Sequence, residues 1–203
     1  MICLLRPGYT KRMIKAVIFD YFDVFRTDGY NRWLRQHGYR RDGAFLEASE
    51  KHDRGEYSDK DFFKAIADAS GETADQVRRE LESDHEFNQP LVDYVRTLKD
   101  RYKLALLSNA SSDYLRNELA QRGIEKYFDE IVISSELGLI KPEPAIFEHI
   151  MEKLGVEPQQ CIFTDDNPKH VEAAEKLGIQ GVVFTSVTEL KQQIEAIVNP
   201  SAT

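Results

Sequence analysis

The chain has 203 residues, with 27 Lys and Arg against 35 Asp and Glu, and a formal net charge of −8. Its length fits one α/β domain, or such a domain with a smaller inserted unit. No cluster of Lys and Arg offsets the acidic balance, so nucleic acid and anionic membranes are not expected partners, although local binding of a phosphate group is still possible.

The two cysteines, Cys3 and Cys161, are isolated from each other, which indicates a reducing compartment rather than a disulfide framework. No apolar run is long enough to span a bilayer. Residues 1–12 lack the pattern of a secretory signal. We expect a loosely held leader before Met13 and a cytoplasmic protein that is a monomer or a weak dimer.

The first expected element is a short strand over residues 16–19, an apolar and partly β-branched run that ends abruptly on Asp20. A run of this kind is typical of a buried parallel strand. In an open α/β sheet, ligands bind beyond the carboxyl ends of the strands. Asp20 is therefore predicted to lie at the functional edge of the sheet. A turn-like cluster follows at residues 26–29.

Residues from about 30 to 89 contain no convincing strand and predict a small helical module. The expected helices cover residues 30–37, 44–52, 59–69 and 74–81. Ser58 and Thr73 are good N-cap residues for the last two, and Gly71 ends the third. This module would be inserted between the first strand and the rest of the sheet.

From Pro90 onward, strands and helices alternate. The expected strands cover residues 103–107, 131–133, 160–163 and 181–184. The expected helices cover residues 90–100, 112–121, 144–154, 168–177 and 187–198, before a frayed tail at 199–203. Short apolar strands alternating with helices predict an α/β fold with a doubly wound, five-stranded parallel sheet. Residues 1–27 and 90–203 would form the core, and residues 28–89 the helical insertion.

Polar residues follow the predicted strands at the points where the strands end. They are Asp20, Ser108, Asn109, Asp165 and Asp166, and a loop after the third strand carries Lys141. Because the carboxyl ends of parallel strands meet at one edge of a sheet, we expect these side chains to converge there.

Phosphoryl transfer to a carboxylate is the chemistry that this set of residues suits. Asp20 would be the nucleophile and would form an acyl-phosphate. Ser108 and nearby backbone N–H groups would hold phosphate oxygens, and Lys141 would neutralise the transferring charge and keep Asp20 ionised. Asp165 and Asp166 would repel each other unless a cation lay between them, and an all-oxygen site favours Mg²⁺.

Four motifs occur in this order along the chain: FDYFDVF, LLSNAS, IKPEP and FTDDNPKHVEAAEKLG. With them the chain resembles the haloacid dehalogenase (HAD) superfamily, in its IA-like subgroup with a small helical cap between the first two motifs. The resemblance extends from about Met13 to Ile197. It implies a five-stranded Rossmann-like core with strand order 5-4-1-2-3 and a mobile cap over the site.

The resemblance also implies roles for individual residues. Asp20, Ser108 and Lys141 would be catalytic, and Ser108, Asn109 and Lys141 would bind the substrate. The implied ligands of Mg²⁺ are Asp20, the backbone carbonyl of Phe22, Asp166 and, assisting it, Asp165. The substrate would be a small phosphorylated molecule.

The residue at position 22 departs from the family pattern. Phosphatases of this family usually carry a second aspartate two residues after the nucleophile, which protonates the leaving oxygen and then deprotonates the attacking water. Phe22 occupies that position, and a phenyl ring cannot transfer a proton. General acid–base catalysis is typically worth about 10²–10⁴-fold, so the loss matters. Asp23 could swing into the site through a turn, or could face solvent.

Three functions are compatible with this pattern. The first, which we predict, is a Mg²⁺-dependent phosphatase whose acid is Asp23, a cap residue or water, and which favours good leaving groups. The second is a haloacid dehalogenase, because a halide needs no proton; those enzymes, however, have serines where this chain has Asp165 and Asp166, and need no metal. The third is a binding or regulatory module with little turnover.

Several further side chains have two interpretations. Arg40, Arg41 and Arg54 could reach a second anionic group of a substrate, or could be solvated surface charges. His170 could help to hold the metal or its water, or could simply lie in the first turn of a helix near the site.

Overall fold

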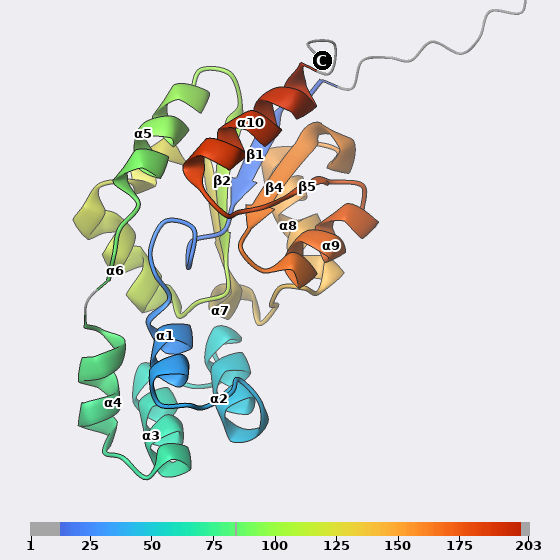
Figure 1. The fold of residues 1–203 in the computed structure, drawn as a ribbon. Helices are drawn as coiled ribbons and strands as arrows, with labels where there is room; N and C mark the ends of the chain where they lie inside the picture. Colours follow the sequence, from blue (N-terminus) through green and yellow to red (C-terminus); the bar gives the residue numbers. More distant parts are fainter. Residues whose placement is uncertain (1–12, 84, 200–203) are drawn as a thin grey trace, which may run out of the picture.

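The computed structural model describes residues 13–83 and 85–199 (Figure 1). The expected leader before Met13, with Cys3, and residues 200–203 of the expected tail lie outside the described residues. Within the described part of the chain, no helix combines the length and the apolar character needed to cross a membrane.

Five parallel strands form one sheet in the order β3-β2-β1-β4-β5, which confirms the predicted order. The strands are β1 (Ala16–Phe19), β2 (Lys103–Ser108), β3 (Glu130–Ile133), β4 (Cys161–Asp165) and β5 (Gln180–Val183). The central strand β1 is completely buried, as expected for a parallel sheet that helices cover on both faces. Its last residue, Phe19, is in register with Leu106 of β2 and Thr164 of β4. The chemistry-bearing ends of these three strands are therefore aligned.

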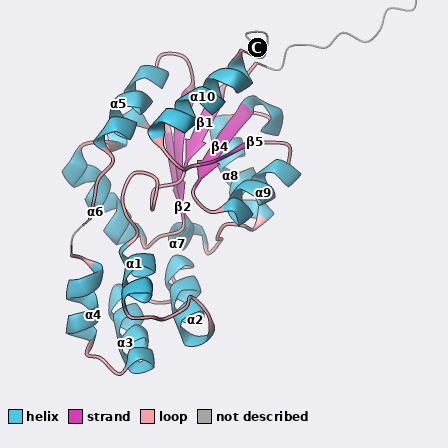
Figure 2. Ribbon diagram, viewed as in Figure 1, coloured by secondary structure: helices cyan, strands magenta, loops and turns pink. Residues whose placement is uncertain are grey.

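Helices cover both faces of the sheet (Figure 2). On one face lie α5 (Gln89–Leu98), α6 (Ser112–Arg122) and α10 (Val187–Val198), which pack on alternate strand residues such as Val17 and Leu106. On the other lie α8 (Pro144–Leu154) and α9 (Pro168–Lys176), which pack on residues such as Ile18. Cys161 is a buried free thiol in this second cluster, so it is a core residue. This alternation of side chains between two covered faces is what doubly wound sheets require.

Four helices between β1 and β2 gather beside the sheet rather than on its faces (Figure 1). They are α1 (Gly29–Gln36), α2 (Gly43–Asp53), α3 (Asp59–Ser70) and α4 (Ala74–Leu81), and we call them the cap helices. They enclose a hydrophobic cluster of their own, centred on the fully buried Trp33, Ile66 and Val77. This separate cluster supports our proposal that residues 28–89 form a cap domain. The helix that follows, α5, begins at Gln89, one residue inside the proposed boundary.

The predicted bounds differ from the observed ones by no more than two residues. The largest difference that bears on function is at β4, which continues to Asp165 because that residue pairs with Val183 of β5. A short helix that the sequence did not predict, α7 (Ser134–Leu137), follows β3 and ends at Gly138, whose φ of 70° suits glycine. The remaining short elements are the 3₁₀ turns η1 (Glu125–Tyr127) and η2 (Pro158–Gln160).

Candidate active site

The carboxyl ends of β1 and β4 and the loop after α7 bring two carboxylates onto one ammonium group. The Lys141 Nζ atom lies 2.6 Å from Asp20 Oδ1 and 2.6 Å from Asp165 Oδ2. All three side chains are buried, with exposed fractions of 1% for Lys141, 8% for Asp20 and 1% for Asp165. Asp20 is held in place through its backbone N–H, which donates to the carbonyl of Thr164. The expected convergence of these residues is therefore present in the structure.

The pKa values of the three ionisable groups in this cluster are shifted in different directions. Burial raises the pKa of Asp20 well above its ordinary value, against the opposing attraction of Lys141. The pKa of Asp165 falls to about 2, because Lys141 and His170 together outweigh its burial. The two carboxylates also outweigh the burial of Lys141, so the pKa of the lysine is raised and it carries a full charge. One ammonium group thus serves two carboxylates, and His170 adds a second stabilising contact to Asp165.

Asp166 adds a third carboxylate to the same place. Oxygen atoms of Asp20, Asp165 and Asp166 lie within 4.8 Å of one another. Burial, followed by the repulsion of Asp165 and Asp23, raises the pKa of Asp166 to about 7. Such a cluster is short of positive charge, and carboxylate oxygens are the donors that Mg²⁺ prefers. The residues present therefore fit the cation that the sequence predicted, although Asp165 is the least free to ligate it, because His170 and the Asn167 N–H engage it in addition to Lys141.

Asn109 clamps the backbone of Lys141. Its side-chain oxygen accepts from the Lys141 N–H at 2.8 Å, and its amide nitrogen donates to the Lys141 carbonyl at 3.0 Å. We predicted Asn109 as a substrate-binding residue, and it does line the cavity. With both ends of its amide engaged, however, its contacts in the structure are those of a residue that positions Lys141.

Ser108, at the end of β2, is fully buried, and its Oγ atom has no hydrogen-bond partner among the described residues. A buried hydroxyl without a partner is uncommon and is consistent with a ligand contact. Two of the backbone N–H groups that follow it are already engaged: Ala110 donates to Ser134 Oγ, and Ser112 donates to Ser135 Oγ, each at 2.9 Å. Of the backbone donors expected near Ser108, these two therefore have partners within the protein.

Phe22 lines the cavity where the sequence expects the family's proton donor to lie. Its ring is held by aromatic neighbours: it stacks on Tyr114 and meets the ring of Tyr21 edge-on at a centroid distance of 5.3 Å. Asp23 has a φ of 55°, in the left-handed region that few residues other than glycine adopt. Its carboxylate accepts from the Asp28 N–H at 2.8 Å and lines the cavity, so it is not simply a solvent-facing turn residue.

His170, near the start of α9, contacts one member of the cluster, Asp165. Its Nδ1 atom lies 3.1 Å from both carboxylate oxygens of Asp165. Burial lowers the pKa of His170, although Asp165 opposes that shift. The ring is outside the group of three carboxylates that could share a metal ion. Its ring nitrogens contact the carboxylate of Asp165, which also accepts from Lys141, and the side-chain nitrogen of Asn167.

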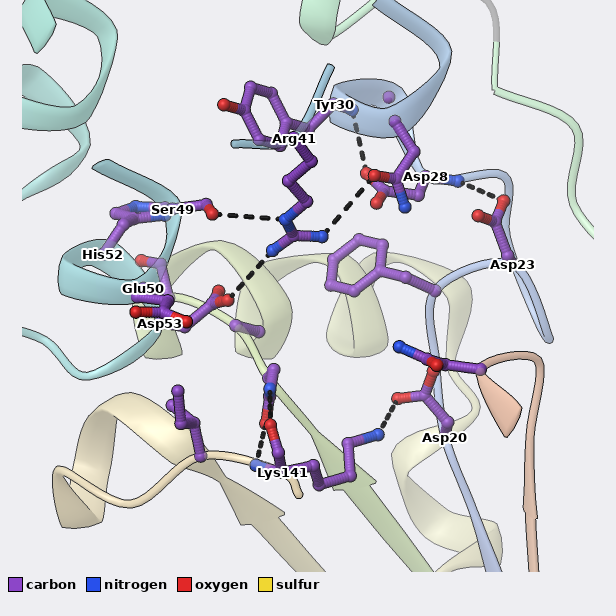
Figure 3. A pocket seen from close by; sticks show the side chains of 18 of the residues that line it. Asp20, Asp23, Asp28, Tyr30, Arg41, Ser49, Glu50, His52, Asp53 and Lys141 are labelled. Carbon is purple, nitrogen blue, oxygen red and sulfur yellow. Dashed lines mark hydrogen bonds and ion pairs between the residues drawn. The ribbon is translucent and has the colours of Figure 1, made fainter. Parts of the chain in front are cut away.

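A cavity of about 590 Å³ lies between this cluster and the cap helices. Figure 3 shows Lys141 and Asp20 at one end, with Arg41, Ser49 and Asp53 at the other. A cavity of this volume is of ordinary size for a small-molecule site. The sequence raised Arg41 only as an alternative and missed Ser49 and Asp53, because helical residues without a motif give no signal that they face a cavity.

Comparisons with known proteins agree with this geometry. The model of the haloacid dehalogenase-like hydrolase family matches residues 11–178. A D-ribitol-5-phosphate phosphatase from Bacteroides thetaiotaomicron is 25% identical over 209 residues, which cover 92% of this chain and 100% of that protein. A phosphorylated carbohydrates phosphatase from Thermotoga maritima is 33% identical over 98 residues, 47% of this chain and 45% of that protein.

Solved structures share the fold. A HAD family enzyme from Bacteroides thetaiotaomicron, in complex with magnesium and inorganic phosphate, superposes with a TM-score of 0.67 at 21% identity. The superposition covers 87% of this chain and 98% of that one. The arrangement of sheet and helices is thus shared across nearly the full length of that protein.

Proposed function

This chain belongs to the haloacid dehalogenase-like hydrolase family, and we propose that it is a Mg²⁺-dependent phosphatase that hydrolyses a small phosphorylated metabolite through an aspartyl-phosphate on Asp20. The relatives with curated functions support a phosphomonoester as the substrate, since they include phosphatases of ribitol 5-phosphate and of phosphorylated carbohydrates. The single observation that carries the proposal is the Lys141 ammonium group held between the Asp20 and Asp165 carboxylates.

The chemistry follows from this arrangement. A carboxylate oxygen of Asp20 attacks the phosphorus atom, the bond to the ester oxygen breaks, and the phosphoryl group is carried on Asp20 until water hydrolyses the acyl-phosphate. Lys141 stabilises the negative charge on the phosphoryl oxygens, and the free hydroxyl of Ser108 is available to donate to one of them. When bound to Asp20, Asp166 and the Phe22 carbonyl, Mg²⁺ would add electrostatic stabilisation of the same charge.

The proton required by the leaving oxygen cannot come from Phe22. Asp23 lines the cavity, but one of its carboxylate oxygens accepts from the Asp28 N–H, so the loop around it holds that carboxylate in place. We therefore propose that water supplies the proton. Substrates with good leaving groups would then be hydrolysed faster than simple alkyl phosphates.

Phe22 would also suit a haloacid dehalogenase, since a departing halide needs no proton. The converged carboxylates count against that second function: Asp20, Asp165 and Asp166 lie close enough to share one cation, which halide displacement does not require. We therefore do not propose the dehalogenase function, and the experiment below includes a test for halide release.

The test is release of inorganic phosphate from p-nitrophenyl phosphate and a panel of metabolite monophosphates, with Mg²⁺ or with a chelator. We expect turnover only with Mg²⁺, and we expect Asp20→Asn to abolish it while the circular dichroism spectrum is retained. Asp68→Asn, an exposed carboxylate on α3, is the matched control and should keep full activity. Undiminished phosphatase activity of Asp20→Asn would sink the proposal, and metal-independent halide release from a 2-haloacid would favour the dehalogenase.

A further inference from the structure

Two adjacent arginines in the loop between α1 and α2 have different surroundings. Arg40 is a surface residue: its side chain is 88% exposed, and it pairs with Asp42. Arg41 instead lines the cavity, and Figure 3 shows its guanidinium group in the centre of the cap end. From the sequence, either arginine could bind a second anionic group of the substrate or be a solvated surface charge. In the structure Arg40 is the surface residue and Arg41 lines the cavity.

The guanidinium group of Arg41 is engaged by the protein on several sides. Its Nε atom donates to Ser49 Oγ at 3.2 Å, one terminal nitrogen donates to Asp53 Oδ2 at 3.4 Å, and the other to Asn31 Oδ1 at 3.5 Å. The group also lies over the ring of Tyr30, 5.6 Å from its centroid. These are long contacts, so they hold Arg41 in the cavity without saturating its donors.

Two half-buried carboxylates, Asp28 and Asp53, lie near the guanidinium group of Arg41. Burial raises the pKa of Asp53 to about 6, and it raises the pKa of Asp28 as well; Arg41 opposes the shift in both cases. Glu50 and Asp59 line the same end of the cavity, where Asp59 is paired with His52. A second phosphate or a carboxylate on the substrate would therefore meet more negative than positive charge around Arg41, and in a partly desolvated site that repulsion is large.

Hydroxyl groups of a substrate, in contrast, can form hydrogen bonds with the charged residues at the cap end of the cavity, which are Arg41, Asp28 and Asp53. A hydroxyl both donates and accepts, so it can donate to Asp28 or Asp53 while it accepts from Arg41. A tail without polar groups would leave the charged side chains of the wall unpaired when it displaced water, which is costly. An ammonium group would be attracted by the carboxylates but repelled by the guanidinium group that lies between them (Figure 3).

We infer that the cap end of the cavity, formed by Arg41 with Asp28, Asn31 and Asp53, binds the uncharged, hydroxyl-bearing tail of the substrate. The substrate class is then a monophosphate ester of a polyol or sugar that carries no second anionic group. This inference rests on the proposed phosphatase function and adds to it the residues that select the substrate. The phosphate would lie at Lys141, at the opposite end of the cavity, and the tail would extend toward the cap helices.

The first experiment compares kcat/KM for four phosphomonoesters in Mg²⁺: ribitol 5-phosphate, phosphoglycolate, phosphoethanolamine and p-nitrophenyl phosphate. We expect ribitol 5-phosphate to exceed phosphoglycolate and phosphoethanolamine by about tenfold or more. Equal or higher kcat/KM for either charged tail would overturn the inference. Activity on p-nitrophenyl phosphate that Asp20→Asn abolishes would meanwhile leave the proposed function intact, so the two failures are distinguishable. Absence of activity on all four would count against both.

The second experiment alters the wall. The double variant Asp28→Asn/Asp53→Asn removes two charges and keeps the shape, and Asn is also a good N-cap for α1 in place of Asp28. We expect the ratio of kcat/KM for phosphoglycolate to that for ribitol 5-phosphate to rise about tenfold or more. A variant that had merely lost its fold would lower both values and could not raise the ratio. An unchanged ratio would contradict the assignment.

The third experiment removes the guanidinium group of Arg41. Arg41→Gln should lower kcat/KM for ribitol 5-phosphate by roughly tenfold to a hundredfold, mainly by raising KM. The fold-loss of kcat/KM for ribitol 5-phosphate should be at least tenfold larger than the fold-loss for p-nitrophenyl phosphate. Arg40→Gln, the neighbouring surface change, is the control and should leave both substrates unaffected. A loss of equal size for both substrates would assign Arg41 a purely structural role and would overturn the inference.

Discussion

The ring of Phe22 stacks on the ring of Tyr114, with centroids 6.3 Å apart and an angle of 23° between the planes. An aromatic pair therefore stands at the position where the sequence predicts the family's proton donor. Because Tyr114 lies near the start of α6, the stack also connects the loop after β1 to a helix on the face of the sheet. The side chain of Phe22 is therefore held by its packing on Tyr114, and it cannot transfer a proton.

Phe22→Asp should restore the missing acid. We expect kcat for an alkyl phosphate, whose leaving oxygen needs a proton, to rise by as much as about 10²-fold, and kcat for p-nitrophenyl phosphate to change far less. Phe22→Asn is the matched control, because it loses the same stacking but cannot transfer a proton. If both variants changed both substrates equally, the absence of an acid at position 22 would not be what limits catalysis.

Lys141→Met should destabilise the protein in a way that depends on metal. It removes the one ammonium group between two buried carboxylates, and breaking a buried ion pair in this way costs about 3–5 kcal/mol. Mg²⁺ would restore part of the loss by neutralising the same carboxylates, so the fall in unfolding free energy should be larger with chelator than with Mg²⁺. Urea unfolding in both conditions measures it.

The control for this change is Lys176→Met on α9, whose side chain is 71% exposed and pairs with Glu172. An exposed pair of that kind contributes little to stability, so this variant should unfold at nearly the same urea concentration as the unmodified protein. A similarly small cost for Lys141→Met would mean that the Lys141 cluster contributes little to stability.

Gly55→Ala should disturb the contact between cap and core. Gly55 has a φ of 75°, and an added Cβ would lie 2.6 Å from the backbone oxygen of Ser135 in α7. The neighbouring Arg54 donates to the carbonyl of Gly138 at 3.0 Å and pairs with Glu143, so this is where α2 meets the loop that carries Lys141. We expect a raised KM for phosphomonoester substrates, in addition to a loss of about 1–2 kcal/mol from the backbone strain.

Gly71→Ala separates strain from contact. Gly71 has a nearly equal φ of 79°, but a Cβ there would meet nothing within 4 Å. It should therefore lose a similar amount of stability to strain and leave KM unchanged. Equal KM values for the two variants would show that the Gly55 contact does not position the cavity wall.

His85→Gln should flatten the decline of stability in mild acid. Burial, with the charges of Arg26 and Arg32, lowers the pKa of His85 from 6.5 to about 4. The folded form therefore keeps the ring neutral, while the unfolded chain takes up a proton below about pH 6.5. The resulting stability is complete above that pH and is lost as the pH falls toward 4.

Because the ring is only half-buried, we expect the loss at pH 5 to be about 1 kcal/mol, less than the full pKa difference implies. Thermal unfolding between pH 7 and pH 5 measures it, and the melting temperature of the variant should fall less than that of the unmodified protein. A steeper fall for the variant would contradict the proposed neutral state of His85.

The positions of the strands and the convergence of Asp20 and Asp165 could be predicted because they depend on short-range signals, whereas the strand order came from the family resemblance. Apolar runs that end on polar residues mark the carboxyl ends of parallel strands, and Gly and Pro mark the helix ends between them. The role of Asn109 could not be read in this way. Its amide bonds to the backbone of Lys141, 32 residues away, and no spacing along the chain indicates that contact.

The sequence by itself determined where the strands and helices lie and the type of chemistry at the strand ends, since these follow from local periodicity and residue types; its four motifs indicated the family, and the resemblance implied the strand order. Only the tertiary structure decided which side chains of the cap helices face the site. Arg40 and Arg41 are adjacent and chemically identical, yet one points to solvent and the other into the cavity. That difference depends on how the loop after α1 packs against α2 and Tyr30, a property of the folded packing and not of any motif.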